Sequence, residues 1–328
     1  MILKARSRGI TVSTEISAAR SNASKSDPKQ FNLALEIGLL MLLSLIWGSS
    51  FTWIKVAIDA IPPLTMTSAR VAIAALLLIL IARLRRLSLP RERGVWAALF
   101  LQGLLQSALP FSLISWGEKH ISSGLAGVLN ATPPMFVLLI AIVTGYRGQR
   151  ITGQNVLGVG LGLVGVLVTL GFQSLQDMHT AAPLAQAAVL GASLCYAVAP
   201  IWGQRFAALP AIVTAAGAMS CAAFMMVPAA LVFERPWTLT PTPEAVAAVI
   251  VLAVLCTATA MVIYFRLVRT LGSLGTASGS YLRAGFAVAL GIIFLGEGFD
   301  WSALAGMLLI VLGVIVVTVP FRRLRRKG

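Results

Sequence analysis

The sequence predicts an all-α polytopic membrane protein with ten transmembrane helices arranged as a 5+5 inverted repeat. Three observations lead to this fold class. The 328-residue chain is 58% hydrophobic and only 11% charged, whereas soluble domains carry roughly 25% charged residues. Its apolar residues form ten segments, each close to the ~20 residues that a helix needs to cross a bilayer. Several motifs also recur about 150 residues apart, which corresponds to five helices.

The ten apolar segments are separated by charged or turn-forming residues. We expect helices at 34–55, 64–84, 95–116, 121–144, 153–171, 182–203, 210–233, 245–267, 272–295 and 301–320. The first repeat then covers 33–172 (helices 1–5), and the second covers 181–320 (helices 6–10). Residues 1–32 are basic and rich in serine, which predicts a disordered cytoplasmic tail. Residues 321–328 form a second basic cytoplasmic tail.

The basic residues are distributed unevenly between the two sides of the predicted bundle. Twenty-one of the 26 Lys and Arg residues fall in the tails and in the loops that follow even-numbered helices. Basic residues are retained on the cytoplasmic side of membranes, so we expect both termini in the cytoplasm. The net charge of +15 is therefore a topology signal, and nothing in it points to nucleic acid as a partner.

The two halves align without gaps within three segments. The aligned pairs include Trp53 with Trp202, Asn130 with Ser280, Gly158 with Gly306 and Gly165 with Gly313. Because five is an odd number, the second copy enters the membrane from the opposite side. In transporters with inverted repeats, substrate sites lie near the midplane between the halves.

Two groups of residues resemble signatures of a known family. The residues Trp47-Gly48, Phe51, Lys55, Pro62-Pro63 and Arg70 are similar to the opening of the EamA family, in the drug/metabolite transporter superfamily. The residues Leu295-Gly296-Glu297, Gly306 and Gly313 resemble the close of its second repeat. The similarity covers residues 35–320. It implies an exporter of small metabolites, often amino acids including aromatic ones, in a bacterial inner membrane.

One position departs from the family pattern. The family commonly has a proline near position 284, where this chain has Ala284, although Pro134 occupies the matching place in the first half. The sequence therefore gives no proline to kink the ninth helix.

Arg283 lies near the middle of the ninth predicted helix, where a charge is costly. Ser273, Thr276, Ser280 and Arg283 share one face of that helix. One interpretation is that Arg283 binds a substrate carboxylate, which a guanidinium matches with two hydrogen bonds. The other is that it bonds to backbone carbonyls freed by a break in a neighbouring helix. Arg70 is interpreted as structural.

Other polar and aromatic side chains within the spans are candidates for the same site. Gln102 and Gln106 share a helix face, and helix–helix hydrogen bonding is their alternative role. Asn130 precedes Pro133-Pro134, which should interrupt the fourth helix. The remaining candidates are Ser280 and the aromatic residues Trp47, Tyr196 and Tyr281, for which core packing is the alternative.

Other functional classes lack the residues that they need. The sequence has no aspartate pair within the spans, as an aspartyl protease needs, and no HExxH motif, as a metalloprotease needs. It also has no histidine within a span to pair with a catalytic serine. We therefore expect neither an enzyme, nor a metal site, nor a cofactor.

The expected partners are a small-molecule substrate and the lipid bilayer, and a homodimer is left open. Without a carboxylate in any span core, transport is expected to be facilitative. The alternative is a transporter of the same fold for nucleosides, sugars, drugs or lipids.

Overall fold

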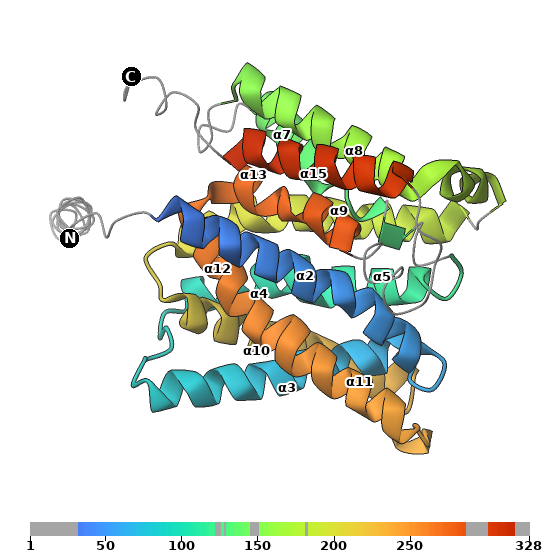
Figure 1. The fold of residues 1–328 in the computed structure, drawn as a ribbon. Coiled ribbons are helices and arrows are strands. Elements are labelled where there is room, and N and C mark those ends of the chain that lie inside the picture. Colours follow the sequence, from blue (N-terminus) through green and yellow to red (C-terminus); the bar gives the residue numbers. More distant parts are fainter. Residues whose placement is uncertain are drawn as a thin grey trace, which may run out of the picture. The chain divides into compact units, whose positions relative to one another are not determined.

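The computed structural model describes residues 32–121, 126–127, 129–144, 151–180, 183–286 and 301–318. Every regular element in these ranges is helical (Figure 1). The α-helices are α2 (Leu33–Ile58), α3 (Pro63–Leu84), α4 (Arg93–Gly103), α5 (Leu109–Gly117), α7 (Pro133–Thr144), α8 (Gly153–Thr180), α9 (Pro183–Gly203), α10 (Ala211–Phe233), α11 (Pro243–Ala253), α12 (Ala260–Thr270), α13 (Gly272–Ala277) and α15 (Trp301–Thr318). Short elements are η1 (Leu104–Ala108), η2 (Gln204–Phe206), η3 (Pro236–Thr238) and η4 (Val254–Thr259).

Within these described residues, six helices are long and apolar enough to cross a membrane. They are Leu33–Ile58, Pro63–Leu84, Arg93–Gly117, Pro183–Phe206, Ala211–Phe233 and Pro243–Thr270. Each coincides with one predicted span. The other four predicted spans correspond to α7, α8, α13 with residues 279–286, and α15. Length and hydropathy thus establish a helical membrane protein, but not the full count of ten. Apart from Asn32, the two predicted tails lie outside the described residues.

A carboxylate from the second half caps the N-terminus of α3. Pro62 and Pro63 start this helix, since proline fits the first helical turn. The free N–H groups of Leu64 and Thr65 donate to the Glu234 carboxylate over 3.0 and 2.6 Å. A negative charge at a helix N-terminus is favourable. The interaction fixes the start of α3 against the end of α10, and the two helices pack along each other.

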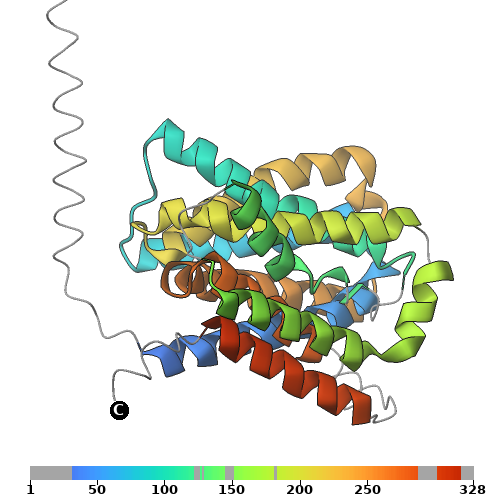
Figure 2. The ribbon, with the colours of Figure 1, turned by 90° about the horizontal axis from the view of Figure 1, so that it is seen from above.

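Helices α8 and α15 lie side by side in both ribbon views (Figures 1 and 2). Glycines allow this close approach, because a Cβ on Gly158 would lie 2.9 Å from the Gly313 carbonyl oxygen. A Cβ on Gly165 would lie 2.8 Å from the Gly306 carbonyl oxygen. Gly158 aligns with Gly306 and Gly165 with Gly313 in the repeat. The contacts are therefore reciprocal, as they are around a two-fold axis.

Two π-helical turns also follow the repeat. The first, η1, lies between α4 and α5, and the second, η4, lies between α11 and α12. Their first residues, Leu104 and Val254, are separated by the same interval as Asn130 and Ser280. A π turn shifts the backbone register and is frequent at functional sites. The sequence predicted continuous helices here, because hydropathy does not report a change of register.

Two predicted helices are interrupted. Asn130, Ala131 and Thr132 are non-helical, and α7 starts at Pro133, as the tandem prolines predicted. The ninth helix is also interrupted, at Ser278, between α13 and residues 279–286. Ser278 Oγ donates to the Gly275 carbonyl over 2.7 Å, a local bond that competes with regular helix. Ser278 nevertheless keeps helical backbone angles (φ −61°, ψ −21°), and its N–H donates to the Leu274 carbonyl over 2.9 Å. The interruption of the ninth helix is therefore slight, and it occurs without a proline.

Candidate substrate-binding site

Two small cavities lie next to each other beside these helix breaks. Both are lined by Trp47 of α2, Tyr196 of α9 and Arg283. The first cavity also includes Arg70 and Asn130, and the second includes Gln106 and Ser280, among other residues. Side chains from both halves of the sequence thus meet at one place. Six of the eight residues predicted from sequence line these cavities.

The cavities are far smaller than a substrate site in its open state. Their volumes are about 20 Å³ and about 30 Å³. A single water needs roughly 10–15 Å³ by the same measure, and ligand pockets typically span ~300–1,000 Å³. Each cavity can therefore hold one or two waters, and a metabolite could enter only if the surrounding helices separated. The structure has a closed arrangement.

Arg283 is 93% buried and joins the ninth helix to the non-helical residue Asn130 before α7. Its Nη2 donates to the backbone carbonyl of Asn130 over 2.7 Å. Its guanidinium carbon lies 5.7 and 5.9 Å from the ring centres of Tyr196 and Phe51. This is the backbone bond that the second sequence interpretation expected. A guanidinium has five N–H donors, and among the described residues this is the only hydrogen bond that Arg283 makes. Donors therefore remain for an anionic group.

Several buried polar atoms near the cavities have no hydrogen-bond partner among the described residues. They include Asn130 Nδ2 beside the first cavity, and Gln106 Oε1 and the Tyr264 hydroxyl beside the second. Buried polar atoms are normally satisfied, and each exception requires an explanation. A donor, an acceptor and a hydroxyl that converge with an arginine are the usual features of a ligand site.

The aromatic residues form one wall of this region. Trp47 Nε1 donates to the Cys256 carbonyl over 3.1 Å, so the indole is fixed to the π turn η4. The ring centres of Trp47 and Tyr264 are 5.8 Å apart. Together with Tyr196, these rings offer an apolar surface beside the polar groups. On the opposite side, Ser280 Oγ donates weakly to the Ala131 carbonyl over 3.4 Å.

Two of the predicted residues lie away from both cavities. Tyr281 is fully buried against α8, where its hydroxyl donates to the Val159 carbonyl over 3.1 Å and its ring fills the space beside Gly162. Gln102 lies near the Tyr264 hydroxyl and Gly203. Neither atom of its amide group has a well-formed hydrogen bond within the described ranges. Tyr281 therefore packs between helices in this arrangement. Gln102 lies outside both cavities, and among the described residues it lacks the well-formed helix–helix hydrogen bond that was its alternative role.

Among the cavity residues that were not selected from sequence, two carry large polar side chains, Arg70 and Tyr264. Arg70 lines the first cavity, although its Nε donates to Thr257 Oγ1 over 2.6 Å and its guanidinium stacks 3.9 Å from the Phe111 ring centre. Tyr264 lines the second cavity. The available sequence signal was that each is a polar residue inside an apolar span. From the sequence, Arg70 was interpreted as structural and Tyr264 was not singled out, because only packing decides which face of a helix turns inward.

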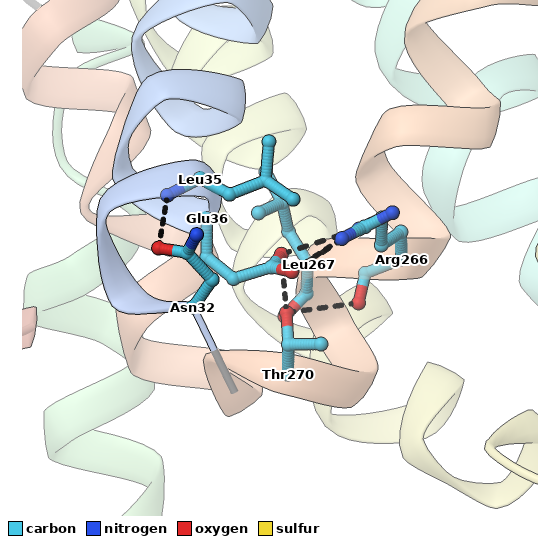
Figure 3. Close-up of polar contacts among 6 residues, drawn as sticks. All are labelled: Asn32, Leu35, Glu36, Arg266, Leu267 and Thr270. Atoms are coloured by element: carbon cyan, nitrogen blue, oxygen red, sulfur yellow. Dashed lines mark hydrogen bonds and ion pairs between the residues drawn. The ribbon is translucent and has the colours of Figure 1, made fainter. Parts of the chain in front are cut away.

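An ion pair links the first turn of α2 to α12 (Figure 3). Arg266 Nη2 and Nε donate to Glu36 Oε1 over 2.7 and 3.2 Å, and Thr270 Oγ1 donates to Glu36 Oε2 over 2.9 Å. The Glu36 side chain is only 4% exposed, and that of Arg266 is 42% exposed. The pair joins α2 of the first half to α12 of the second.

No cluster of metal ligands occurs in the part of the chain that the structure describes.

Comparison with known proteins assigns the fold and its two repeats to a family. The model of the EamA-like transporter family matches residues 34–171 and again residues 184–319. The chain belongs to the EamA-like transporter family. The resemblance expected from the sequence motifs is confirmed, and the two matched segments are the two copies of the family's domain.

Several relatives of this EamA protein are named as transporters or exporters. It is 28% identical over 285 residues to the "Uncharacterized inner membrane transporter YedA" of Escherichia coli (strain K12), covering 86% of this chain and 90% of the relative. It is 25% identical over 285 residues to the "Uncharacterized transporter YoaV" of Bacillus subtilis (strain 168), covering 87% and 97%. A third relative, from Streptantibioticus cattleyicolor, is named "Probable terminal-alkyne amino-acid exporter" and is 25% identical over 287 residues, covering 87% and 94%.

A solved structure has the same fold. A chain described only as "Crystal structure of protein" superimposes with a TM-score of 0.70 at 21% identity. The match covers 89% of this chain and 99% of that chain. Because the identity is low, this similarity concerns the fold alone.

Proposed function

We propose that this EamA protein exports small metabolites that carry a carboxylate, amino acids above all and aromatic ones among them. The observation that carries the proposal is the position of Arg283. A buried cation with unused donors lies beside unpartnered polar atoms and aromatic rings at the meeting point of both halves. A carboxylate is the group that a guanidinium binds best. One relative named as a probable amino-acid exporter supports the same substrate class.

Each group at the site has a role in this proposal. Arg283 binds the substrate carboxylate, and Asn130 and Gln106 bind its other polar groups. Trp47 and Tyr196 pack against its side chain. Since the cavities hold only a few waters, the substrate enters when one end of the bundle opens. We propose that the Glu36–Arg266 pair is broken when the end that it joins opens.

The membrane arrangement belongs to the same proposal. We propose ten helices in a 5+5 inverted repeat in a bacterial inner membrane, with both termini cytoplasmic. The reciprocal glycine contacts of α8 and α15 and the matching π turns support a two-fold relationship between the halves. The uneven distribution of basic residues supports the orientation. Transport is driven by the substrate's own gradient, and a homodimer is compatible with this arrangement.

Counterflow uptake into proteoliposomes tests this function. Labelled phenylalanine and threonine are offered to vesicles preloaded with unlabelled substrate, for the wild type and for Arg283→Ala. We expect uptake by the wild type and its loss in the variant, with both proteins monodisperse after purification. Equal uptake by both would keep the carrier and make Arg283 a structural residue. An added protonophore should leave wild-type uptake unchanged.

The alternative substrates can be separated with masked ligands. Methyl esters of the same amino acids lack the negative charge that Arg283 is proposed to bind. Binding that survives esterification would favour the alternative of nucleosides, sugars, drugs or lipids.

A further inference from the structure

A buried carboxyl group close to Arg70 is not used by the proposed transport site. Glu118 follows α5 and is 99% buried. Neither of its oxygens has a hydrogen-bond partner among the described residues. The sequence placed it in a loop between spans, where a carboxylate would ordinarily be hydrated. A buried carboxylate without partners is strongly disfavoured, so such a group either takes up a proton or acquires a ligand.

The charges that face Glu118 come from two neighbouring helices and its own turn. Lys55, in the last turn of α2, and Arg70 of α3 both act on it electrostatically. Lys119 and His120 follow it and are exposed. The α9 segment that packs against Gly117 contains Ala185 and Val189 and no titratable residue from 183 to 192. Two cations therefore favour the ionised form, and burial opposes it.

Burial is the larger of these effects. It raises the pKa of the Glu118 carboxyl from 4.5 to about 8, although Lys55 and Arg70 act in the opposite direction. The carboxyl group is therefore largely protonated at neutral pH and loses its proton in mildly alkaline solution.

Glu118 is connected to the first cavity through Arg70 and Ile114. Its backbone N–H donates to the Ile114 carbonyl over 2.9 Å, and Ile114 lines that cavity. Arg70 lines the same cavity and bonds to Thr257 and the Cys256 carbonyl rather than to a carboxylate. When Glu118 is neutral, Arg70 and Arg283 both present positive charge to the cavity. When Glu118 is ionised, its negative charge offsets that of Arg70.

We propose that Glu118 is a proton-binding site whose protonation strengthens the binding of a carboxylate in the neighbouring cavity through the charge of Arg70. This inference rests on the proposed function, because it takes a carboxylate as the ligand. The coupling is reciprocal: a carboxylate that binds near Arg70 makes Glu118 hold its proton more tightly. Glu118 lies beyond the end of α5, so it regulates binding and does not need to carry a proton across the membrane.

The proton site is tested first, without any ligand. Thermal stability of the wild type, Glu118→Gln and Glu244→Gln is compared from about pH 6 to about pH 9. A carboxyl group whose pKa is raised by folding contributes stability that is fully present below its pKa in the unfolded chain. This stability is lost as the pH rises through its pKa in the folded protein. The wild type and Glu244→Gln, whose altered carboxylate is exposed, should therefore lose stability toward pH 9 relative to Glu118→Gln. If thermal stability changes with pH in the same way in all three proteins, Glu118 is not a proton-binding site.

The coupling is then tested with 3-phenylpropionate, a carboxylate without an amine that would titrate in this range. We expect its affinity for the wild type to fall roughly tenfold between about pH 6.5 and about pH 9, within the ~5–150-fold typical of coupled sites. In Glu118→Gln the affinity should stay at the low-pH value, while His120→Gln should behave as the wild type. The same pH dependence in wild type and Glu118→Gln would overturn the coupling.

The stability experiment and the binding experiment together distinguish a failure of this inference from a failure of the proposed function. If 3-phenylpropionate and phenylalanine bind at no pH, the carboxylate substrate is wrong and the coupling is overturned with it. The stability curves still decide by themselves whether Glu118 binds a proton. If phenylalanine is transported but binding does not depend on Glu118, the proposed function stands and this inference fails.

Discussion

The Arg283 guanidinium donates a 2.7 Å hydrogen bond to the backbone carbonyl of Asn130, a residue 153 positions earlier in the chain. The bond links the break before α7 to the helical residues 279–286, and so it links the two repeats at the cavities. The acceptor is free because Pro133 and Pro134 have no backbone N–H to offer it. The bond uses the Asn130 backbone, so the Asn130 side chain can be changed without removing it.

Asn130→Ala is therefore expected to weaken substrate binding while leaving the protein folded. The lost side chain includes Nδ2, which is buried beside the first cavity without a partner. Loss of a hydrogen bond to a charged group costs about 1.5–3 kcal/mol, or roughly 10- to 150-fold in affinity. Calorimetric titration with phenylalanine measures the effect. Asn130→Asp should abolish binding, because it puts a second anion beside the carboxylate, and wild-type affinity in both variants would contradict the assignment.

Gln106→Leu and Gln102→Leu are expected to separate two residues that the sequence treated alike. Gln106 lines the second cavity, and its Oε1 has no partner among the described residues. Gln102 lies outside both cavities. Counterflow uptake should fall at least about tenfold in Gln106→Leu and stay near wild type in Gln102→Leu. The stability of both should be kept or raised, since an unpaired buried amide is replaced by an apolar group of similar size. Impaired uptake in Gln102→Leu alone would reverse the assignment.

Gly165→Ala is expected to destabilise the protein, and Gly160→Ala serves as its control on the same helix. A Cβ on Gly165 would lie 2.7 Å from the Ile310 amide nitrogen, which belongs to the backbone and cannot move aside. A Cβ on Gly160 meets nothing within 4 Å. Overpacking costs about 1–3 kcal/mol, whereas alanine in an open helical position gains about 0.5–1 kcal/mol over glycine. Thermal unfolding in detergent should order the stabilities as Gly160→Ala, wild type, then Gly165→Ala. A Gly165→Ala protein as stable as the wild type would argue against close packing of α8 and α15.

Arg266→Ala is expected to weaken the contact between α2 and α12 at the ion pair. Among the described residues, the substitution leaves the buried Glu36 carboxylate with only Thr270 as a partner. An unsatisfied buried group costs roughly 1–3 kcal/mol. Arg269→Ala should cost less than about 0.5 kcal/mol. Arg269 is exposed, and its hydrogen bond within the described part of the chain goes to the Leu209 carbonyl. Urea unfolding compares the two variants.

The double change Glu36→Gln with Arg266→Gln distinguishes charge from packing at this site. Removing both charges removes the cost of burying an unpaired carboxylate. Part of the stability lost in Arg266→Ala should therefore return. A double variant less stable than Arg266→Ala would show that the side-chain packing of Arg266, and not its charge, is what matters.

Much of the candidate site was within reach of sequence reasoning. The tandem prolines after Asn130 predicted a broken helix, and the isolated charge of Arg283 predicted a side chain turned away from lipid. Both predictions depend on strong local costs: a missing backbone donor and a charge in an apolar span. Such costs act whatever the packing, so they can be read from a single sequence. The hydropathy likewise predicted a helical membrane protein, and the resemblance of its motifs pointed to the EamA family.

Only the tertiary structure decided which side chains face the cavities. Gln102 lies one helical turn from Gln106, and Tyr281 lies next to Ser280, yet neither lines a cavity. The reason is that the rotation of each helix depends on its neighbours. The π turns η1 and η4 change that rotation and leave no trace in hydropathy. The burial of Glu118, next to a turn, also follows only from packing against other helices. Where local preference is weak, contacts between distant parts of the chain determine the outcome.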